Sequence, residues 1–170
     1  MRSGRLRLLA IAAVAATAAC SAADRTTAPL VRPDLADAPE QTLLYCPTSW
    51  SRTAIATIGP SGGSVGIGGA RLTLPPGAVS ATTTFVVKVP ASQHLEAEFH
   101  AYGRSSFQFD VPATITISYR RCGDVDGPFR AWYIDDETKA LLENMGGVTD
   151  TVARTHTFQT GHLSGYAVAN

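Results

Sequence analysis

One short segment near the end of the chain carries residue types that could do chemistry. His162 and Ser164 flank Leu163, and a serine hydroxyl becomes an effective nucleophile only when a nearby base takes its proton. Gly161 and Gly165 bracket the segment and would permit a sharp bend in the backbone. The same residues also fit a structural role, because Leu163 is the first apolar residue of a predicted final strand. The sequence leaves a reactive and a structural interpretation open.

No other set of residues has the spacing of a known catalytic or metal site. Residues 124–127 (Asp-Val-Asp-Gly) contain only a fragment of a calcium loop and suit a turn equally well. The glycine-rich residues 62–69 lack the spacing of a nucleotide-binding loop. There is no Gly-x-Ser-x-Gly elbow, and no Cys-x-x-Cys or short-spaced histidine pair that would predict zinc. We therefore expect neither a cofactor nor a bound metal. The four histidines are His94, His100, His156 and His162.

The first 19 residues predict export. Three arginines precede an apolar run at residues 8–19, which is the pattern of a signal peptide and is too short for a stable transmembrane anchor. The run ends in Ala-Ala-Cys20 and resembles the bacterial lipobox, in which the cysteine is acylated and the chain is cut just before it. Ordinary cleavage at an Ala-x-Ala-like site is the alternative. In Gram-negative lipoproteins, an aspartate directly after the acylated cysteine favours retention in the inner membrane. Ser21 stands at this position, so we expect the protein in the outer membrane.

Charge narrows the choice of partners. The chain has 14 basic and 14 acidic residues, and removal of the signal peptide takes three arginines, which leaves a net charge of −3. Mild acidity argues against a nucleic-acid partner and against a basic membrane-binding face. We expect membrane contact through the N-terminal lipid alone.

The remaining chain divides into a tether and one domain. Residues 20–41 are rich in Ala, Asp, Pro and Thr without apolar periodicity, so we predict a flexible tether that follows the lipidated cysteine. Residues 42–170 are long enough to bury a core. After Cys20 is used, Cys46 and Cys122 remain, and an even number of cysteines in an oxidising compartment predicts a disulfide. Two buried thiols are the alternative.

The patterning of residues 42–170 is that of an all-β domain. Turn signals recur about every ten residues, which predicts an antiparallel β-sandwich. Residues 141–145 are the one stretch that could be helix or strand. We expect a core that contains Leu72, Leu74, Val87, Ile115 and Ile117. The predicted strands are 55–58, 64–67, 71–74, 83–89, 95–100, 106–109, 113–119, 130–134, 140–143, 151–158 and 164–168.

The stretch Ile58–Val79 combines strand, hairpin and turn signals. It reads Gly-Pro-Ser-Gly-Gly-Ser, then an alternating strand, a Gly68-Gly69 hairpin turn and Leu-Thr-Leu-Pro-Pro-Gly-Ala-Val. It resembles the opening of the ZU-five domain of zonula occludens protein, Unc-five receptors and ankyrins. Val111–Tyr119 and Gly161–Val168 fit the later parts of that domain, so that the resemblance covers residues 55–170.

The resemblance bears on function in two ways. ZU-five domains commonly mediate protein contacts, so we expect a non-enzymatic interaction or structural module. Some relatives cleave themselves at His-Phe-Ser, and adhesion-receptor autoproteolysis domains use His-Leu-Ser, which implies serine attack at the bond between Leu163 and Ser164 with His162 as base. Such a cut also needs a strained peptide. We expect an intact chain, with self-processing and a carbohydrate- or peptidoglycan-binding module as the alternatives.

Overall fold

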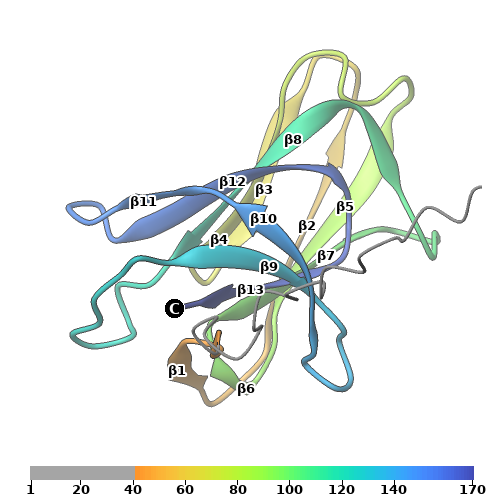
Figure 1. The fold of residues 1–170 in the computed structure, drawn as a ribbon. Helices are drawn as coiled ribbons and strands as arrows, with labels where there is room; N and C mark the ends of the chain where they lie inside the picture. Colours follow the sequence, from red (N-terminus) through yellow and green to blue (C-terminus); the bar gives the residue numbers. More distant parts are fainter. Residues whose placement is uncertain (1–40) are drawn as a thin grey trace, which may run out of the picture. The chain divides into compact units, whose positions relative to one another are not determined.

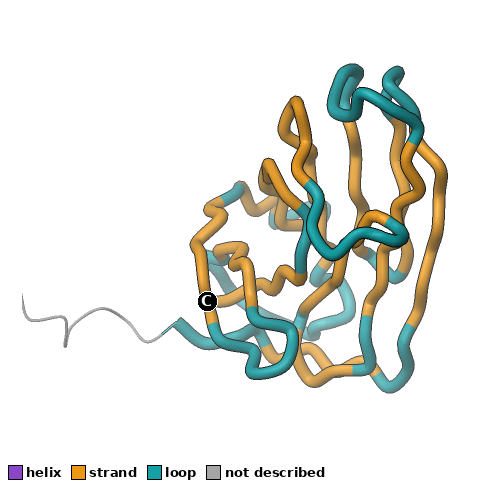
Figure 2. The backbone as a smooth tube through the Cα atoms, turned by 90° about the vertical axis from the view of Figure 1, so that its right-hand side faces the viewer, coloured by secondary structure: helices purple, strands orange, loops and turns teal. Residues whose placement is uncertain are grey.

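The computed structural model describes residues 41–170, which form strands joined by turns and loops (Figures 1 and 2). The predicted signal peptide, Cys20 and nearly all of the predicted tether lie outside the described residues. Residues 41–170 contain no helix that is long and apolar enough to span a membrane. The predicted all-β, antiparallel class is confirmed.

Two large antiparallel sheets account for most of the domain. One sheet has six strands in the order β10-β9-β13-β7-β5-β2, and the other has five in the order β11-β12-β8-β4-β3. Strands β1 and β6 form a small separate sheet. The strands are β1 Tyr45–Thr48, β2 Arg52–Ile58, β3 Gly63–Ile67, β4 Ala70–Leu74, β5 Thr83–Val89, β6 Ser92–His94, β7 Glu96–Ala101, β8 Gln108–Ser118, β9 Arg130–Ile134, β10 Leu141–Gly146, β11 Val148–Asp150, β12 Thr155–His162 and β13 Gly165–Ala169.

The core lies between the buried faces of the two large sheets. Alternation within each strand directs every second side chain inward, as in β5, where Phe85, Val87 and Val89 are buried. Aromatic rings join the sheets, since Phe158 of β12 and Tyr166 of β13 lie 5.2 Å apart between centroids. The predicted core residues are all buried, as expected: Leu72, Leu74, Val87, Ile115 and Ile117.

The predicted hairpin turn joins β3 and β4. Ile67 pairs with Ala70 across the turn, and Gly68 and Gly69 have φ values of 60° and 93°. Positive φ at both central positions is what a primed two-residue turn requires, and glycine adopts it without steric cost. The hairpin prediction is confirmed, and the turn brings Gly68 close to Val89 at one end of the domain.

Some predicted strand boundaries are wrong. The predicted strands 106–109 and 113–119 are a single strand, β8, in which the pairing with β12 shifts register between Thr160 and His162. Pro112 lies inside β8 at this irregularity, where its missing N–H breaks no regular ladder. The predicted strand 151–158 begins only at Thr155, because residues 151–154 form a turn in which Arg154 has φ 52°. The ambiguous residues 141–145 belong to strand β10.

The N-terminal end of the domain is fixed to the last strand. The Leu44 amide donates to the Val168 carbonyl at 2.8 Å, and the Leu95 amide donates to the Leu44 carbonyl at 2.9 Å. Thr42 and Asn170 exchange two backbone hydrogen bonds. Strand β1 then pairs with β6, so that the segment leading from β1 to β2 runs across one end of the domain (Figure 1).

Candidate functional site

The predicted self-processing segment connects β12 to β13. His162 is the last residue of β12, and Leu163 and Ser164 form the link to Gly165. The backbone is held on both sides of the bond in question. The Leu163 amide donates to the Phe107 carbonyl at 3.1 Å, and the Ser164 carbonyl accepts from the Phe99 amide at 2.9 Å. The link is therefore part of the hydrogen-bonded fold.

The His162 imidazole contacts aromatic side chains. Its Nδ1 lies 3.3 Å from the Tyr166 hydroxyl, and its ring meets the Tyr133 ring edge to face at 5.4 Å between centroids. Within residues 41–170 no hydrogen bond joins this imidazole to the Ser164 hydroxyl. The structure brings His162 and Ser164 into one segment but does not pair them as base and nucleophile.

Tyr166 is the centre of this polar cluster. Its hydroxyl donates to the His162 carbonyl at 2.7 Å and lies 2.8 Å from the Thr160 hydroxyl. Burial raises the pKa of Tyr166 well above its usual value, so the phenol stays protonated and keeps its donor. The cluster of Thr160, His162 and Tyr166 thus fixes the turn between two strands that belong to different sheets.

The described part of the chain offers no metal centre. No group of three or more His, Cys, Asp or Glu side chains in residues 41–170 is placed to hold an ion. His156 is fully buried between the Thr149 hydroxyl at 2.9 Å from Nδ1 and the Gly146 carbonyl at 2.9 Å from Nε2. Asp135 accepts hydrogen bonds from the amides of Glu137 and Thr138, which is typical of an aspartate in a turn.

The predicted disulfide joins Cys46 to Cys122, with 4.7 Å between their Cα atoms. Cys46 lies in β1, and Cys122 follows β8. The bond therefore ties the N-terminal segment to the loop that leaves the five-stranded sheet. It also brings the residues that follow Cys46 close to Arg121, which directly precedes Cys122 in the chain.

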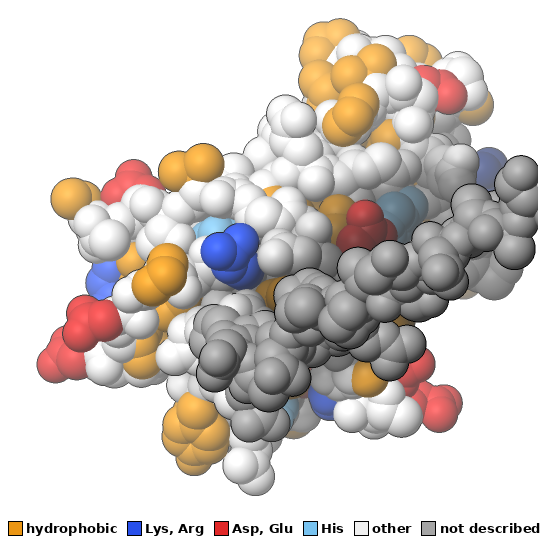
Figure 3. Space-filling model, in the orientation of Figure 1, with side chains coloured by type: hydrophobic (Ala, Val, Ile, Leu, Met, Phe, Trp, Pro, Cys, Tyr) orange, Lys and Arg blue, Asp and Glu red, His pale blue; other side chains and the backbone are white. Residues whose placement is uncertain are grey.

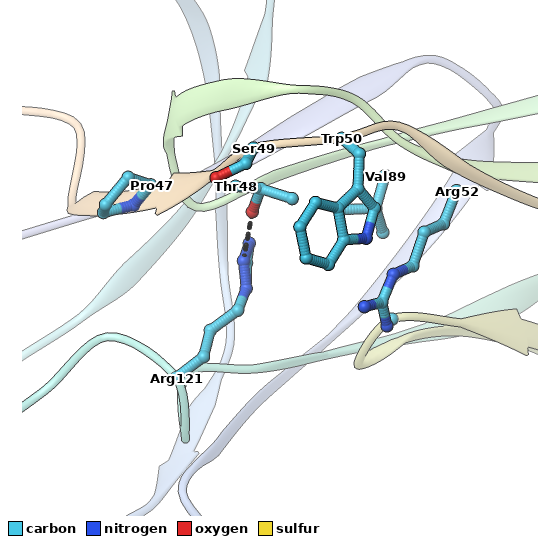
Figure 4. A pocket seen from close by; sticks show the side chains of 8 residues that line it. Pro47, Thr48, Ser49, Trp50, Arg52, Val89 and Arg121 are labelled. Carbon is cyan, nitrogen blue, oxygen red and sulfur yellow. Dashed lines mark hydrogen bonds between the residues drawn. The ribbon is translucent and has the colours of Figure 1, made fainter.

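A cavity of about 200 Å³ lies beside this disulfide. Its walls come from the β1–β2 segment, the start of β2, the β3–β4 turn, the end of β5 and the loop after β8. In the view of Figure 4, the Trp50 indole lies between the side chains of Arg52 and Arg121. The lining residues are Pro47, Thr48, Ser49, Trp50, Arg52, Gly68, Val89 and Arg121.

Within residues 41–170, the two arginines of the cavity have no acidic partner. Among the described residues, neither Arg52 nor Arg121 lies within ion-pair distance of a carboxylate. Arg121 donates through Nη1 to the Thr48 hydroxyl. Burial lowers the pKa of Arg121, and the positive charge of Arg52 lowers it further. A guanidinium nevertheless remains charged at any physiological pH, so two positive charges face one cavity.

Trp50 gives the same cavity an apolar wall. Its side chain is 62% exposed, unusual for so large an apolar group. The Arg52 guanidinium carbon lies 5.6 Å from the centroid of the Trp50 ring, which is a cation–π contact that orients both groups. On the part of the domain that is visible in Figure 3, charged side chains lie in small separate groups among hydrophobic and uncharged ones.

Sequence reasoning did not find this cavity. Its residues come from four separate parts of the chain and form no motif. A signal was nevertheless present, because the predicted link between Cys46 and Cys122 also implies that Arg121 lies near residues 47–52.

Comparison with known proteins assigns neither a family nor a function to this chain. The chain matches no model of a known protein family and no curated protein.

Proposed function

We propose that this chain is a lipid-anchored protein of a Gram-negative envelope whose β domain is a non-enzymatic binding module. The observation that carries the proposal is the cavity beside the disulfide, in which Arg52 and Arg121 face solvent together with an exposed indole. Charged and aromatic groups that converge on an open cavity are typical of binding sites. The ligand-binding surface is the one at Trp50, and the segment around His162 is structural.

The proposed fold within the all-β class is a ZU-five-like β-sandwich. Three stretches support it, because the residues that carry the resemblance form the β3–β4 hairpin, strand β8 and the end of β12 together with β13. The hairpin with its Pro-Pro-Gly turn contributes buried side chains from both strands, including Val65 and Leu72. The fold supports an interaction module but does not define its ligand.

The proposed anchor is an acyl group on Cys20, followed by the tether at residues 21–41. It is supported by the short apolar run that ends at the cysteine. A Cys20→Ala chain should leave the membrane fraction and appear in the soluble envelope fraction. Unchanged membrane association of this variant would contradict lipid anchoring.

The binding function is tested by retention on immobilised envelope material. We expect the full chain to be retained on the protein or the polysaccharide fraction of the envelope, and a Trp50→Ala, Arg121→Gln chain to be lost from it. Arg130→Gln is the matched control, because Arg130 is exposed and does not line the cavity. Equal retention of wild type and the double variant would show that the cavity is not the binding site.

A polysaccharide partner is the second candidate, and Trp50 favours it. An exposed indole beside hydroxyl groups offers an apolar face and hydrogen-bonding groups together. A sugar ring presents an apolar face, which can stack on the indole, and hydroxyl groups, which can bond to the hydroxyl groups of the cavity.

A further inference from the structure

The charges of the cavity select the charge of its ligand. Arg52 and Arg121 line the same cavity on either side of the Trp50 indole. The charge of Arg52 lowers the pKa of Arg121, so an anionic group in the cavity relieves the repulsion between the two arginines. Arg121 uses one donor on Thr48, and a guanidinium has five. Several donors remain for a carboxylate or a phosphate, the groups that match guanidinium geometry.

The apolar wall selects a ligand with a flat, non-polar face. The Trp50 indole is exposed, and Arg52 already holds it by the cation–π contact. An oriented aromatic ring loses little conformational freedom when a second ring stacks on it. Thr48 and Ser49 add hydroxyl groups at the rim, where they can donate to or accept from hydroxyl groups of a ligand.

The size of the cavity limits the ligand to a single unit. A volume of about 200 Å³ is below the roughly 300–1,000 Å³ typical of pockets that enclose drug-sized molecules. One sugar ring with its charged substituent suits this volume, while the rest of a longer chain would extend into solvent.

The construction of the cavity favours a glycan over a peptide. An extended peptide usually docks along a strand edge and forms main-chain hydrogen bonds there. Here the stretch 47–52 supplies most of the lining, and Gly68, Val89 and Arg121 complete it from distant segments. The groups that converge on the cavity are the side chains of Trp50, Arg52 and Arg121, which suit recognition of one unit.

We infer that the cavity binds one acidic sugar unit of a glycan, whose ring stacks on Trp50 while its carboxylate or phosphate is held by Arg52 and Arg121. This inference rests on the proposed binding function and gives its ligand class. The two anionic groups share one recognition chemistry, and the probes below distinguish them.

The test is calorimetric titration of the purified full chain with matched probes. A trimer of galacturonic acid supplies carboxylated sugar rings, and its methyl ester supplies the same rings without charge. Galactose 6-phosphate supplies the phosphate, and triglutamate supplies carboxylates without a sugar. We expect the acid trimer or the sugar phosphate to bind at least about tenfold more tightly than the ester, because charged hydrogen bonds are lost with the ester.

Variants tie the binding to the cavity. Arg52→Gln and Arg121→Gln should each weaken binding about tenfold or more, Trp50→Ala should weaken it comparably, and Arg130→Gln should leave it unchanged. Thermal unfolding of each variant checks that the fold is retained. Arg121→Lys keeps the positive charge but loses the paired donors of the guanidinium, so it separates the contribution of charge to binding from that of paired hydrogen bonds. Binding that falls steeply with added salt is expected, because the cavity is open to solvent.

The outcomes separate this inference from the proposed function. Equal binding of the ester and the acid overturns the requirement for charge. Binding of triglutamate but of neither acidic sugar overturns the glycan assignment and leaves the binding function standing. Failure of every probe, with Arg52- and Arg121-dependent retention on envelope protein, likewise overturns the glycan assignment alone. Failure of every probe and of envelope retention overturns both.

Discussion

The segment around His162 and the cavity beside Trp50 both gather polar side chains, but only the first satisfies them within the domain. The Tyr166 hydroxyl, the His162 carbonyl and the Thr160 hydroxyl bond to one another in the interior. The two arginines of the cavity instead face solvent on either side of the Trp50 indole. A closed network of this kind holds a turn in place, whereas unpaired charges on a rigid frame can bind a ligand.

The contrast also follows from the position of each region in the fold. The His162 segment links strands of two different sheets and is half-buried beside the fully buried Tyr166, so its polar atoms find their partners within the domain. The cavity lies among loops and strand ends that a single disulfide holds together. Loops at the end of a rigid β framework are where binding residues tend to lie.

We expect the largest effect on stability from removal of the disulfide beside the cavity. A chain with Cys46→Ser and Cys122→Ser should lose about 4 kcal/mol of unfolding free energy, because the bond closes a loop with a sequence separation of 76 residues. Chemical denaturation without reductant measures the difference. A double variant as stable as the wild type would show that hydrogen bonds alone hold the β1 segment.

Removal of the Tyr166 hydroxyl should have a smaller effect on stability and tests the hydrogen-bonded network around His162. Tyr166→Phe should reduce the unfolding free energy by about 1–3 kcal/mol, because the buried His162 carbonyl and Thr160 hydroxyl lose a partner. The matched control is Tyr45→Phe, since Tyr45 is 63% exposed and its change should stay within about 0.5 kcal/mol. Equal effects at both tyrosines would remove the distinction between the two regions.

The buried His156 should make the stability of the domain depend on pH. Burial lowers the pKa of His156 below its usual 6.5, with an opposing contribution from its bond to Gly146. The unfolded chain therefore takes up the proton first as pH falls. The stabilisation is complete above about pH 6.5 and is lost progressively below it, toward the lower pKa of the folded state.

Denaturation at about pH 7.5 and about pH 5.5 measures this effect against other titrating groups. His156→Gln should show a smaller loss of stability between the two pH values than the wild type. An identical loss in both chains would mean that His156 is not the group responsible.

The open region should tolerate substitution. Arg52→Gln should change the unfolding free energy by no more than about 0.5 kcal/mol, because Arg52 has no carboxylate partner among the described residues and repels Arg121. The same thermal or chemical unfolding experiment suffices. A large destabilisation would indicate that Arg52 serves the fold and would weaken its assignment to ligand binding.

No effect at all is expected from Ser164→Ala on chain length. Mass spectrometry of denatured wild-type protein should give a chain that still contains residues 164–170, because the His162 imidazole bonds to Tyr166 and not to Ser164. A species that lacks these residues in the wild type but not in Ser164→Ala would establish self-cleavage.

Local patterns predicted much of the fold. The alternation in β5 and the Gly68-Gly69 turn each depend on neighbouring residues, and both were predicted correctly. The disulfide was predicted from the expected oxidising compartment and the number of cysteines, and the structure contains it. Strands β1 and β6 were missed because they have only four and three residues and little alternation. The two halves of β8 were separated in the prediction although they form one strand across Pro112.

The candidate site was harder to predict because it depends on tertiary contacts. Trp50 and Arg52 have no spacing that marks a ligand site, and Arg121 joins them only through the fold. His162 and Ser164, by contrast, match a short motif, but the direction of the imidazole depends on Tyr166 from the next strand. Motifs report which residues are neighbours in the chain, and a site depends on which are neighbours in space.

The bond between Cys46 and Cys122 also determines how the domain would carry mechanical load. Both walls of the cavity connect to it directly, since Pro47 follows Cys46 and Arg121 precedes Cys122. A pull on residue 41 against a ligand held by Trp50 and Arg121 would therefore run through a few residues and one covalent bond. Residues 53–120, which contain most of the core, lie outside that path, so the domain could hold its ligand under shear without unfolding.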